Sequence, residues 1–257
     1  MEDIKNYDTY INGMNKSAKD KLFFLDKVDE IATVVDFGCA DGNLAKCIIE
    51  ENKNLTVYGY DINDEMLKIA KSNNKDNRTI FSSDFATICH HIEPEETVLN
   101  MSSVLHEVYS YSKPDEINKF WENVFESDFK YISLRDFCIG RSANRDSDIN
   151  DYTKVLSKGD GQQIQEYEDI WGSLKSNHNL IHYLMKYRYK ENWNREVREN
   201  YFPLSLEGLL SKIPTDQYKI VYFENYILPY TSKKVKEDFG IEIRDNTHIK
   251  ILLEKVA

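Results

Sequence analysis

An acid and two glycines stand close together in the run VVDFGCADG, which spans residues 34–42. Asp36 ends a stretch of β-branched residues, and Gly38 and Gly42 follow on either side of Ala40, just before the helical spacing of LAKCIIEE. Glycines at such positions let the backbone turn sharply and let a bulky ligand lie against it. A dinucleotide site would require G-x-G-x-x-G, whereas the register here is G-x-A-x-G. The run therefore predicts a ligand site at the end of a strand, in a register that differs from the dinucleotide fingerprint.

Three more segments follow in order: VYGYD ends at Asp61, SSDF holds Asp84 and Phe85, and NMSSVLHEV spans residues 100–108. With the first run they resemble the motifs of the class I S-adenosylmethionine-dependent methyltransferases over residues 30–137, although Ala40 stands where glycine is commonest. The resemblance implies S-adenosylmethionine as cofactor, with Asp61 accepting from both ribose hydroxyls and Asp84 at the adenine amino group. One carboxylate can accept from two vicinal donors. The cofactor residues expected on this basis are Asp36, Gly38, Ala40, Gly42, Asp61, Ile62, Met66, Asp84, Phe85 and Met101.

Each motif also has an ordinary structural explanation, because glycine turns and acids at strand ends occur in many proteins without such ligands. A nicotinamide-dependent oxidoreductase is the weaker alternative, since the spacing does not suit it. A non-catalytic protein that only binds S-adenosylmethionine is a further alternative, because a fold does not determine an activity.

Methyl transfer from a sulfonium is an in-line displacement, so the protein must align the reactants and remove a proton where the acceptor loses one. His106 and Glu107 follow the fourth expected strand, at the edge of the sheet where the ligand should lie, and are the predicted catalytic residues. His106 would act as the base, although a histidine there could equally shape the pocket. No Asn-Pro-Pro-aromatic or Asp-Pro-Pro-aromatic run occurs, which argues against methylation of exocyclic amino groups on bases.

The methyl acceptor is predicted from aromatic and cationic residues. The expected acceptor-binding residues are Tyr109, Arg135, Tyr183, Tyr187 and Trp193. Tyr109 could instead pack under the insertion, and Arg135 could pair with Asp136. Residues 175–198 contain six lysines and arginines against two glutamates, which suits a nucleotide or an RNA loop and equally suits a solvated helix facing an acidic core. His178 and His182 stand four apart, but no HExxH pattern or third ligand accompanies them, so no metal is predicted.

Strands alternating with helices must position these residues. They predict an α/β fold, a doubly wound and mostly parallel seven-stranded Rossmann-like sheet with an antiparallel edge pair. YKIVYFENYIL and THIKILLEKV are expected as the last two strands, in sequence without an intervening helix. The expected division is an N-terminal helical cover over 1–30, with an apolar stripe at Leu22, Leu25 and Val28, a cofactor-binding core over 31–137, a helical lid insertion over 138–204, and the rest of the sheet over 205–257.

Composition limits the partners. The net charge of -11 repels phosphate backbones, so a small-molecule acceptor is favoured over RNA such as tRNA. The four cysteines form no CxxC pair and are expected to be thiols. No apolar run is long enough to suggest a membrane span, and a cytoplasmic protein is expected.

Overall fold

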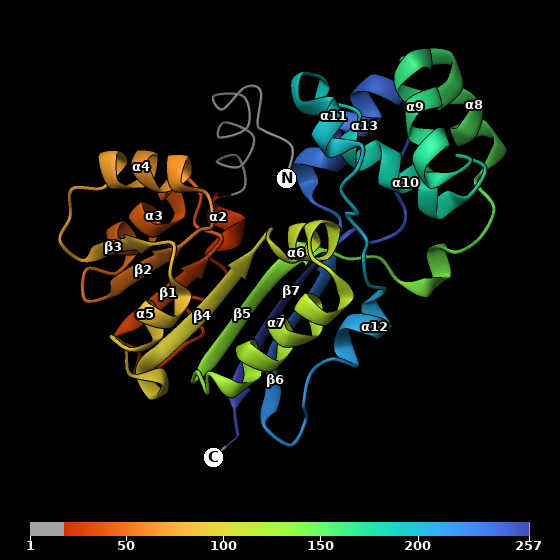
Figure 1. Cartoon of the computed structure of the whole chain (residues 1–257). Coiled ribbons are helices and arrows are strands. Elements are labelled where there is room, and N and C mark those ends of the chain that lie inside the picture. Colours follow the sequence, from red (N-terminus) through yellow and green to blue (C-terminus); the bar gives the residue numbers. More distant parts are fainter. Residues whose placement is uncertain (1–17, 257) are drawn as a thin grey trace.

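A seven-stranded sheet with the strand order β3-β2-β1-β4-β5-β7-β6 forms the centre of the computed structural model, which describes residues 18–256 (Figure 1). The strands are β1 (Thr33–Phe37), β2 (Thr56–Tyr60), β3 (Thr79–Ser82), β4 (Thr97–Ser102), β5 (Tyr131–Phe137), β6 (Tyr218–Tyr226) and β7 (His248–Lys255). The first five pair in parallel, and β7 is antiparallel to both β5 and β6. The predicted fold, with its reversed strand near one edge, is confirmed.

Helices cover both faces of the sheet, which the alternation of side chains along β1 illustrates. Val34 packs with α3 (Asn43–Glu51) and α4 (Asp64–Asn73), whereas Val35 packs on the opposite face with α5 (Phe85–Cys89) and α7 (Pro114–Glu126). Asn63 caps α4 by accepting from the backbone N–H groups of Glu65 and Met66. Shorter helices complete this part: α6 (Leu105–Tyr111), α12 (Leu206–Leu210), η1 (Pro94–Glu96) and η2 (Arg141–Ala143).

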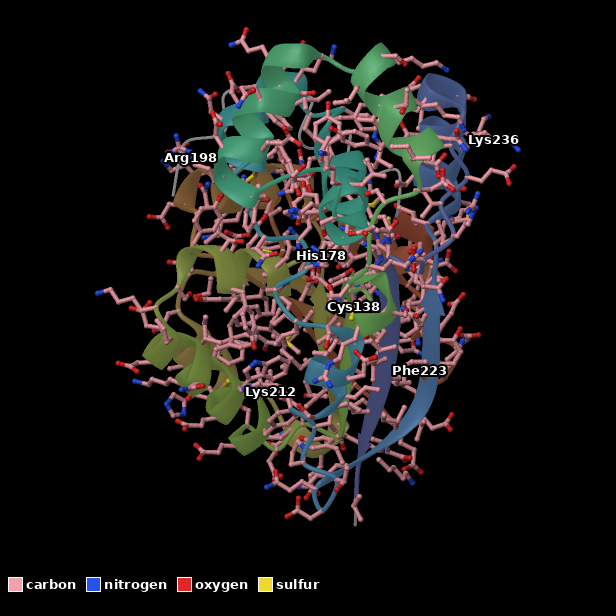
Figure 2. All side chains as sticks on the ribbon, turned by 90° about the vertical axis from the view of Figure 1, so that its right-hand side faces the viewer. Cys138, His178, Arg198, Lys212, Phe223 and Lys236 are labelled. Atoms are coloured by element: carbon pink, nitrogen blue, oxygen red, sulfur yellow. The ribbon has the colours of Figure 1, made fainter. Side chains whose placement is uncertain are left out.

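A second group of helices stands at the carboxyl end of β5 and the amino end of β7, and we call it the helical cap (Figure 1). It comprises α8 (Ile149–Lys158), α9 (Gly161–Trp171), α10 (Asn177–Lys186), η3 (Lys190–Asn192), α11 (Trp193–Glu196) and α13 (Pro229–Phe239). These helices enclose an apolar core of their own that includes Tyr167, Leu184 and Phe239. In Figure 2, Arg198 and Lys236 lie on opposite sides of the cap, and His178 lies where the cap meets the sheet.

Helix α13 lies between β6 and β7, so the prediction of two final strands without an intervening helix was wrong. Its buried residues are Thr231, Val235 and Phe239, one every fourth position in an otherwise charged segment. Such a narrow stripe is a weak sequence signal for a helix.

The N-terminal segment differs partly from the predicted amphipathic helix. Helix α2 (Ala18–Lys21) ends before the stripe at Leu22, Leu25 and Val28, which continues in hydrogen-bonded turns. The stripe nevertheless packs on the core beside α3, as expected of a cover. Residues 1–17 of that prediction lie outside the described residues. Within the described part of the chain, no helix has the length and apolar character needed to cross a membrane.

Candidate active site

The turn after β1 forms the floor of the site. Gly38, Ala40 and Gly42 have positive φ angles of 78°, 45° and 72°. The N–H groups of Gly38 and Cys39 donate to the Tyr60 carbonyl at 2.8 and 2.9 Å, which ties the turn to the end of β2. A Cβ atom on Gly38 would stand 2.7 Å from Val104 Cγ2, so only glycine fits there. The turn predicted from sequence therefore exists. Ala40 adopts the left-handed backbone conformation, which is unfavourable for most residues other than glycine.

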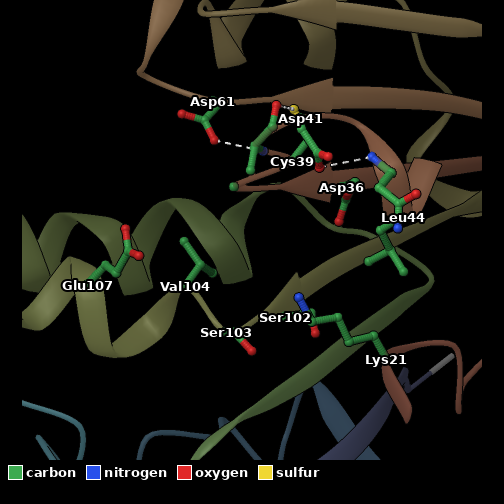
Figure 3. A pocket seen from close by; sticks show the side chains of 13 residues that line it. Lys21, Asp36, Cys39, Asp41, Leu44, Asp61, Ser102, Ser103, Val104 and Glu107 are labelled. Atoms are coloured by element: carbon green, nitrogen blue, oxygen red, sulfur yellow. Dashed lines mark hydrogen bonds between the residues drawn. The ribbon is translucent and has the colours of Figure 1, made fainter. Parts of the chain in front are cut away.

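Two adjoining cavities open on this turn. The larger measures about 250 Å³ and the smaller about 70 Å³. Five residues line both of them: Gly38, Ala40, Asp61, Val104 and Glu107. The larger cavity has apolar walls formed by Phe37, Tyr60, Ile62, Met66, Val104 and Phe120. The smaller cavity is more polar, and its lining includes Lys21, Asp36 and Ser102 (Figure 3).

The predicted cofactor residues are distributed unevenly around this space. Asp36, Gly38, Ala40, Asp61, Ile62 and Met66 line one or both cavities. Gly42 shapes the turn without lining them, and Met101 is 1% exposed within the core. Asp84 caps α5 through Thr87, and the Phe85 ring packs on Phe37 and Tyr60, behind the cavity wall. Met101, Asp84 and Phe85 therefore support the site from outside the cavities.

The donor and acceptor groups fit S-adenosylmethionine. Asp61 accepts from the N–H groups of Ala40 at 2.9 Å and Asn63 at 2.8 Å, and burial raises the pKa of its carboxyl group. Each carboxylate oxygen keeps capacity to accept from a further donor, as two ribose hydroxyls would require. Ile62 is 63% exposed at the rim, where it provides an apolar surface for a flat ring. Asp36 Oδ2 and Ser102 Oγ are buried and have no hydrogen-bond partner among the described residues, and polar groups of a ligand would supply one.

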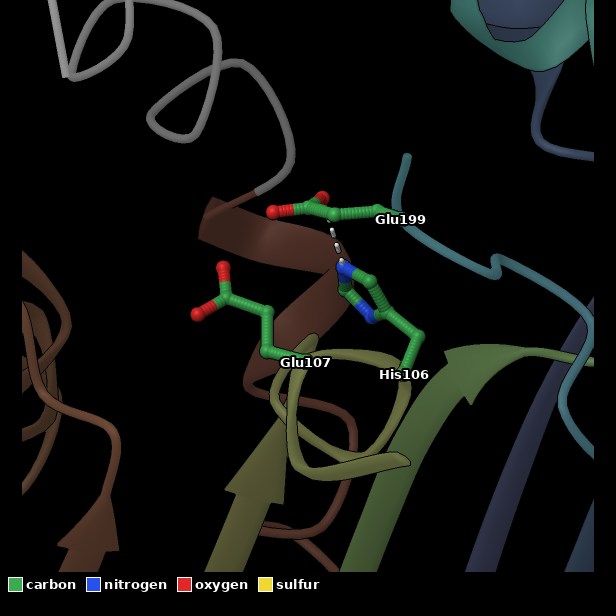
Figure 4. A group of neighbouring side chains, drawn as sticks. All are labelled: His106, Glu107 and Glu199. Carbon is green, nitrogen blue, oxygen red and sulfur yellow. Dashed lines mark ion pairs between the residues drawn. The ribbon is translucent and has the colours of Figure 1, made fainter. Parts of the chain in front are cut away.

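His106 lies in a buried ion cluster beneath the cap (Figure 4). Its Nδ1 lies 2.7 Å from Asp136 Oδ1, and its Nε2 lies 4.0 Å from Glu199 Oε2. Burial alone would lower the pKa of His106, but Asp136, Glu199 and Glu107 outweigh it and raise the pKa to about 9. An imidazolium has no lone pair with which to accept a proton, and His106 lines neither cavity. The geometry therefore favours the alternative of a structural histidine over that of a base.

Glu107, the second predicted catalytic residue, lines both cavities. Its carboxylate accepts from Arg195 Nη2 of α11 at 2.9 Å, and Arg195 Nε donates to Glu199 at 2.8 Å. The Tyr111 hydroxyl also donates to Glu199, at 2.8 Å. His106, Glu107 and Glu199 offer atoms within 4.8 Å of one another, but both carboxylates already pair with a guanidinium. Arg195 and Tyr111 also line the larger cavity, although neither is among the five expected acceptor-binding residues.

The expected acceptor-binding residues lie elsewhere. Tyr183 donates to Gln163, Tyr187 to Asp238 and Trp193 to Glu166, all within the helical cap, and these three rings are buried in the core of the cap. The structure therefore does not bring these three rings to the cavities, because α9 and α13 cover the apolar face on which they lie. The other two expected acceptor-binding residues, Tyr109 and Arg135, do not line the cavities either. The Tyr109 hydroxyl accepts from Trp121 Nε1 at 2.8 Å, and the partner of Arg135 is Asp20 at 3.0 Å in place of the expected Asp136.

The cationic tract is not a continuous basic face. Lys186 and Arg195 are buried, and Lys186 Nζ donates to the backbone carbonyls of Glu196 and Glu199. Arg188 is half-buried over the ring of Tyr230. Only the remaining three of the six cations are exposed: Lys175, Lys190 and Arg198.

Comparison with known proteins agrees with this geometry. The family profile of the methyltransferase domain matches residues 9–137, just over half of the chain. An S-adenosylmethionine-dependent methyltransferase from Anabaena variabilis is 14% identical with a TM-score of 0.54, over 99% of this chain and 96% of that one. PhzM, a pyocyanin biosynthetic protein, is 10% identical with a TM-score of 0.55, over 96% of this chain and 57% of that one. The MccD protein is 11% identical with a TM-score of 0.51, over 95% and 98%. A search of curated proteins found no match.

At sequence identities of 10 to 14%, the similarity to these three solved structures shows that this chain has the same fold. The profile match covers every residue that lines the two cavities except Arg195, including the turn after β1, Asp61 and the end of β4. The family and the fitted site together assign S-adenosylmethionine as the cofactor. The chain belongs to the methyltransferase-domain family and is an S-adenosylmethionine-dependent methyltransferase.

Proposed function

We propose that this enzyme methylates a small molecule bound between the carboxyl edge of the sheet and the helical cap. The observation that carries the proposal is the position of Arg195, which reaches from the cap into the lining of the cofactor cavity and pairs there with Glu107. The cap therefore lies directly against the reactive end of the site. A small acceptor can be enclosed in such a space, whereas a long polymer needs an open approach.

The roles of the residues follow from this arrangement. When bound, S-adenosylmethionine supplies a methyl group on a positively charged sulfur. Asp61 and the turn at Gly38 hold the cofactor against β1 and β2, and Glu107 presents a carboxylate to the space beyond it. That carboxylate can accept a hydrogen bond from an acceptor and so orient it. PhzM, named for the biosynthesis of the small molecule pyocyanin, has a similar fold, which supports an acceptor of this class.

Transfer of label from methyl-labelled S-adenosylmethionine tests the proposal. The enzyme is incubated separately with a low-mass metabolite fraction and with total RNA, and label is expected in the metabolites alone. The exposed cations allow a matched control, because Lys190→Glu combined with Arg198→Glu should leave this transfer unchanged. Label in RNA that is lost in the charge-reversed variant would show that the acceptor is RNA.

A further inference from the structure

We infer that Lys21 binds the carboxylate of the cofactor's amino-acid portion, so that the N-terminal segment is part of the cofactor site. The inference rests on the assignment of S-adenosylmethionine as the cofactor. Lys21 ends α2, and its side chain lines the smaller cavity together with Asp36 and Ser102 (Figure 3). It is 9% exposed, and its ammonium makes no hydrogen bond or ion pair within the part of the chain that the structure describes.

The opposite wall of this cavity carries the complementary charge. Asp36 Oδ1 accepts from Asn100 Nδ2 at 2.9 Å, but among residues 18–256 neither Asp36 Oδ2 nor Ser102 Oγ has a hydrogen-bond partner. A cation, a carboxylate oxygen and a hydroxyl thus line the same small space with bonding capacity left over. Buried polar groups are normally satisfied, so two such atoms beside the buried Lys21 around one cavity point to a ligand. A zwitterionic amino acid matches them, with its carboxylate at Lys21 and its ammonium at Asp36.

The electrostatics of the two side chains agree with this pairing. Burial, assisted by Arg135, lowers the pKa of Lys21 to about 8, and burial raises the pKa of Asp36 to about 6. Both shifts disfavour the charged form, as expected for charges that lack close partners. A bound zwitterion would supply an opposite charge to each of them.

Asp20, the neighbour of Lys21, fixes its position. The Asp20 carboxylate accepts from Arg135 Nε at 3.0 Å and from the Tyr226 hydroxyl at 2.5 Å, and it lies 2.7 Å from Lys250 Nζ. These partners come from β5, β6 and β7, so their contacts with Asp20 hold α2 against that half of the sheet. The Lys21 side chain points the other way, toward the ends of β1 and β4 (Figure 3). Asp20 is therefore a positioning residue, and Lys21 is the ligand.

Calorimetry of the full chain with two ligands tests the inference. S-adenosylhomocysteine carries the amino-acid portion, and 5′-methylthioadenosine lacks it. Lys21→Met should weaken binding of S-adenosylhomocysteine by about 10-fold or more, the worth of one charge-assisted hydrogen bond, and leave binding of 5′-methylthioadenosine unchanged. Lys19→Met, on the exposed side of the same helix, should change neither affinity. Lys21→Arg should restore most of the selectivity, which a purely structural loss would not allow.

The outcomes separate this inference from the cofactor assignment. An equal loss for both ligands would make Lys21 structural, and an unchanged affinity for S-adenosylhomocysteine would show that Lys21 does not contact the cofactor. Either result would overturn the inference while leaving the enzyme's cofactor in place. Failure of the unmodified protein to bind S-adenosylhomocysteine would instead overturn the cofactor assignment, and with it the inference.

Discussion

Asp61 has two tasks in this structure. Its oxygens accept from Ala40 and Asn63, which holds the turn after β1 against the start of α4, and the same carboxylate lines both cavities. A loss of the carboxylate therefore affects both the shape of the turn and the contact with the ribose.

We expect Asp61→Ala to weaken binding of S-adenosylhomocysteine by roughly 2 to 3 kcal/mol, because two charge-assisted hydrogen bonds are lost. Asp61→Asn keeps one acceptor oxygen for the turn and should show a smaller loss. Calorimetry at neutral pH measures both variants. An unchanged affinity in Asp61→Ala would mean that this carboxylate does not touch the cofactor.

His106 should be charged at neutral pH, because Asp136 and two glutamates raise its pKa to about 9 despite its burial. Since the folded-state pKa lies above the ordinary value of 6.5, the stabilisation is complete below pH 6.5 and is lost as the pH rises through 9. The difference in unfolding free energy between the unmodified protein and His106→Gln should therefore shrink across that range. An NMR titration of the ring gives the pKa directly, and a midpoint near 6.5 would restore His106 as a candidate base.

At the scale of elements, α11 connects the cap to the core through Arg195. The side chain of Arg195 is 3% exposed, and its guanidinium pairs with Glu107 of α6 and with Glu199. Glu199 also accepts a hydrogen bond from the hydroxyl of Tyr111, which lies at the end of α6. The junction between cap and core is thus a buried network in which the guanidinium of Arg195 pairs with two carboxylates.

Arg195→Met should destabilise the protein by about 3 to 5 kcal/mol, because it removes the guanidinium that pairs with two carboxylates at the buried junction. Arg198→Met, three residues along and exposed, is the matched control and should change stability by no more than about 0.5 kcal/mol. Denaturant unfolding followed by circular dichroism compares the two. Equal stability of both variants would contradict the view that Arg195 holds the cap.

Local signals in the sequence predicted most of the core, and tertiary packing decided what they missed. The strands and the turn at Gly38 are encoded by short runs of β-branched residues and glycines, so their positions were confirmed. Tyr183 and Trp193 carry no sign of which neighbour will cover them, and α9 and α13 do so. Lys21 is positioned by the contacts of its neighbour Asp20 with three strands that are distant in the sequence. The spacing of residues along the chain does not reveal such contacts.

For the whole molecule, cofactor binding should appear as a gain in stability. A ligand that binds only the folded state stabilises it by mass action, by about 2.7 kcal/mol at a concentration of 100 times Kd. Thermal unfolding with increasing S-adenosylhomocysteine should follow this dependence, whereas nicotinamide dinucleotides should have no effect. A shift with the dinucleotide and none with S-adenosylhomocysteine would contradict the assigned cofactor.

The cap is assembled from two parts of the chain, since α13 arrives after β6 has been made. During synthesis, chains emerge from the ribosome N-terminus first, so α8 to α11 are present before Val235 and Phe239 can cover their apolar side. The nascent cap therefore exposes an unfinished hydrophobic surface until nearly the whole chain is out. A product truncated just before residue 229 would keep the first six strand segments, with β6 lacking its partner β7, and an open cap core. Such a product would be a natural target for chaperones and proteases.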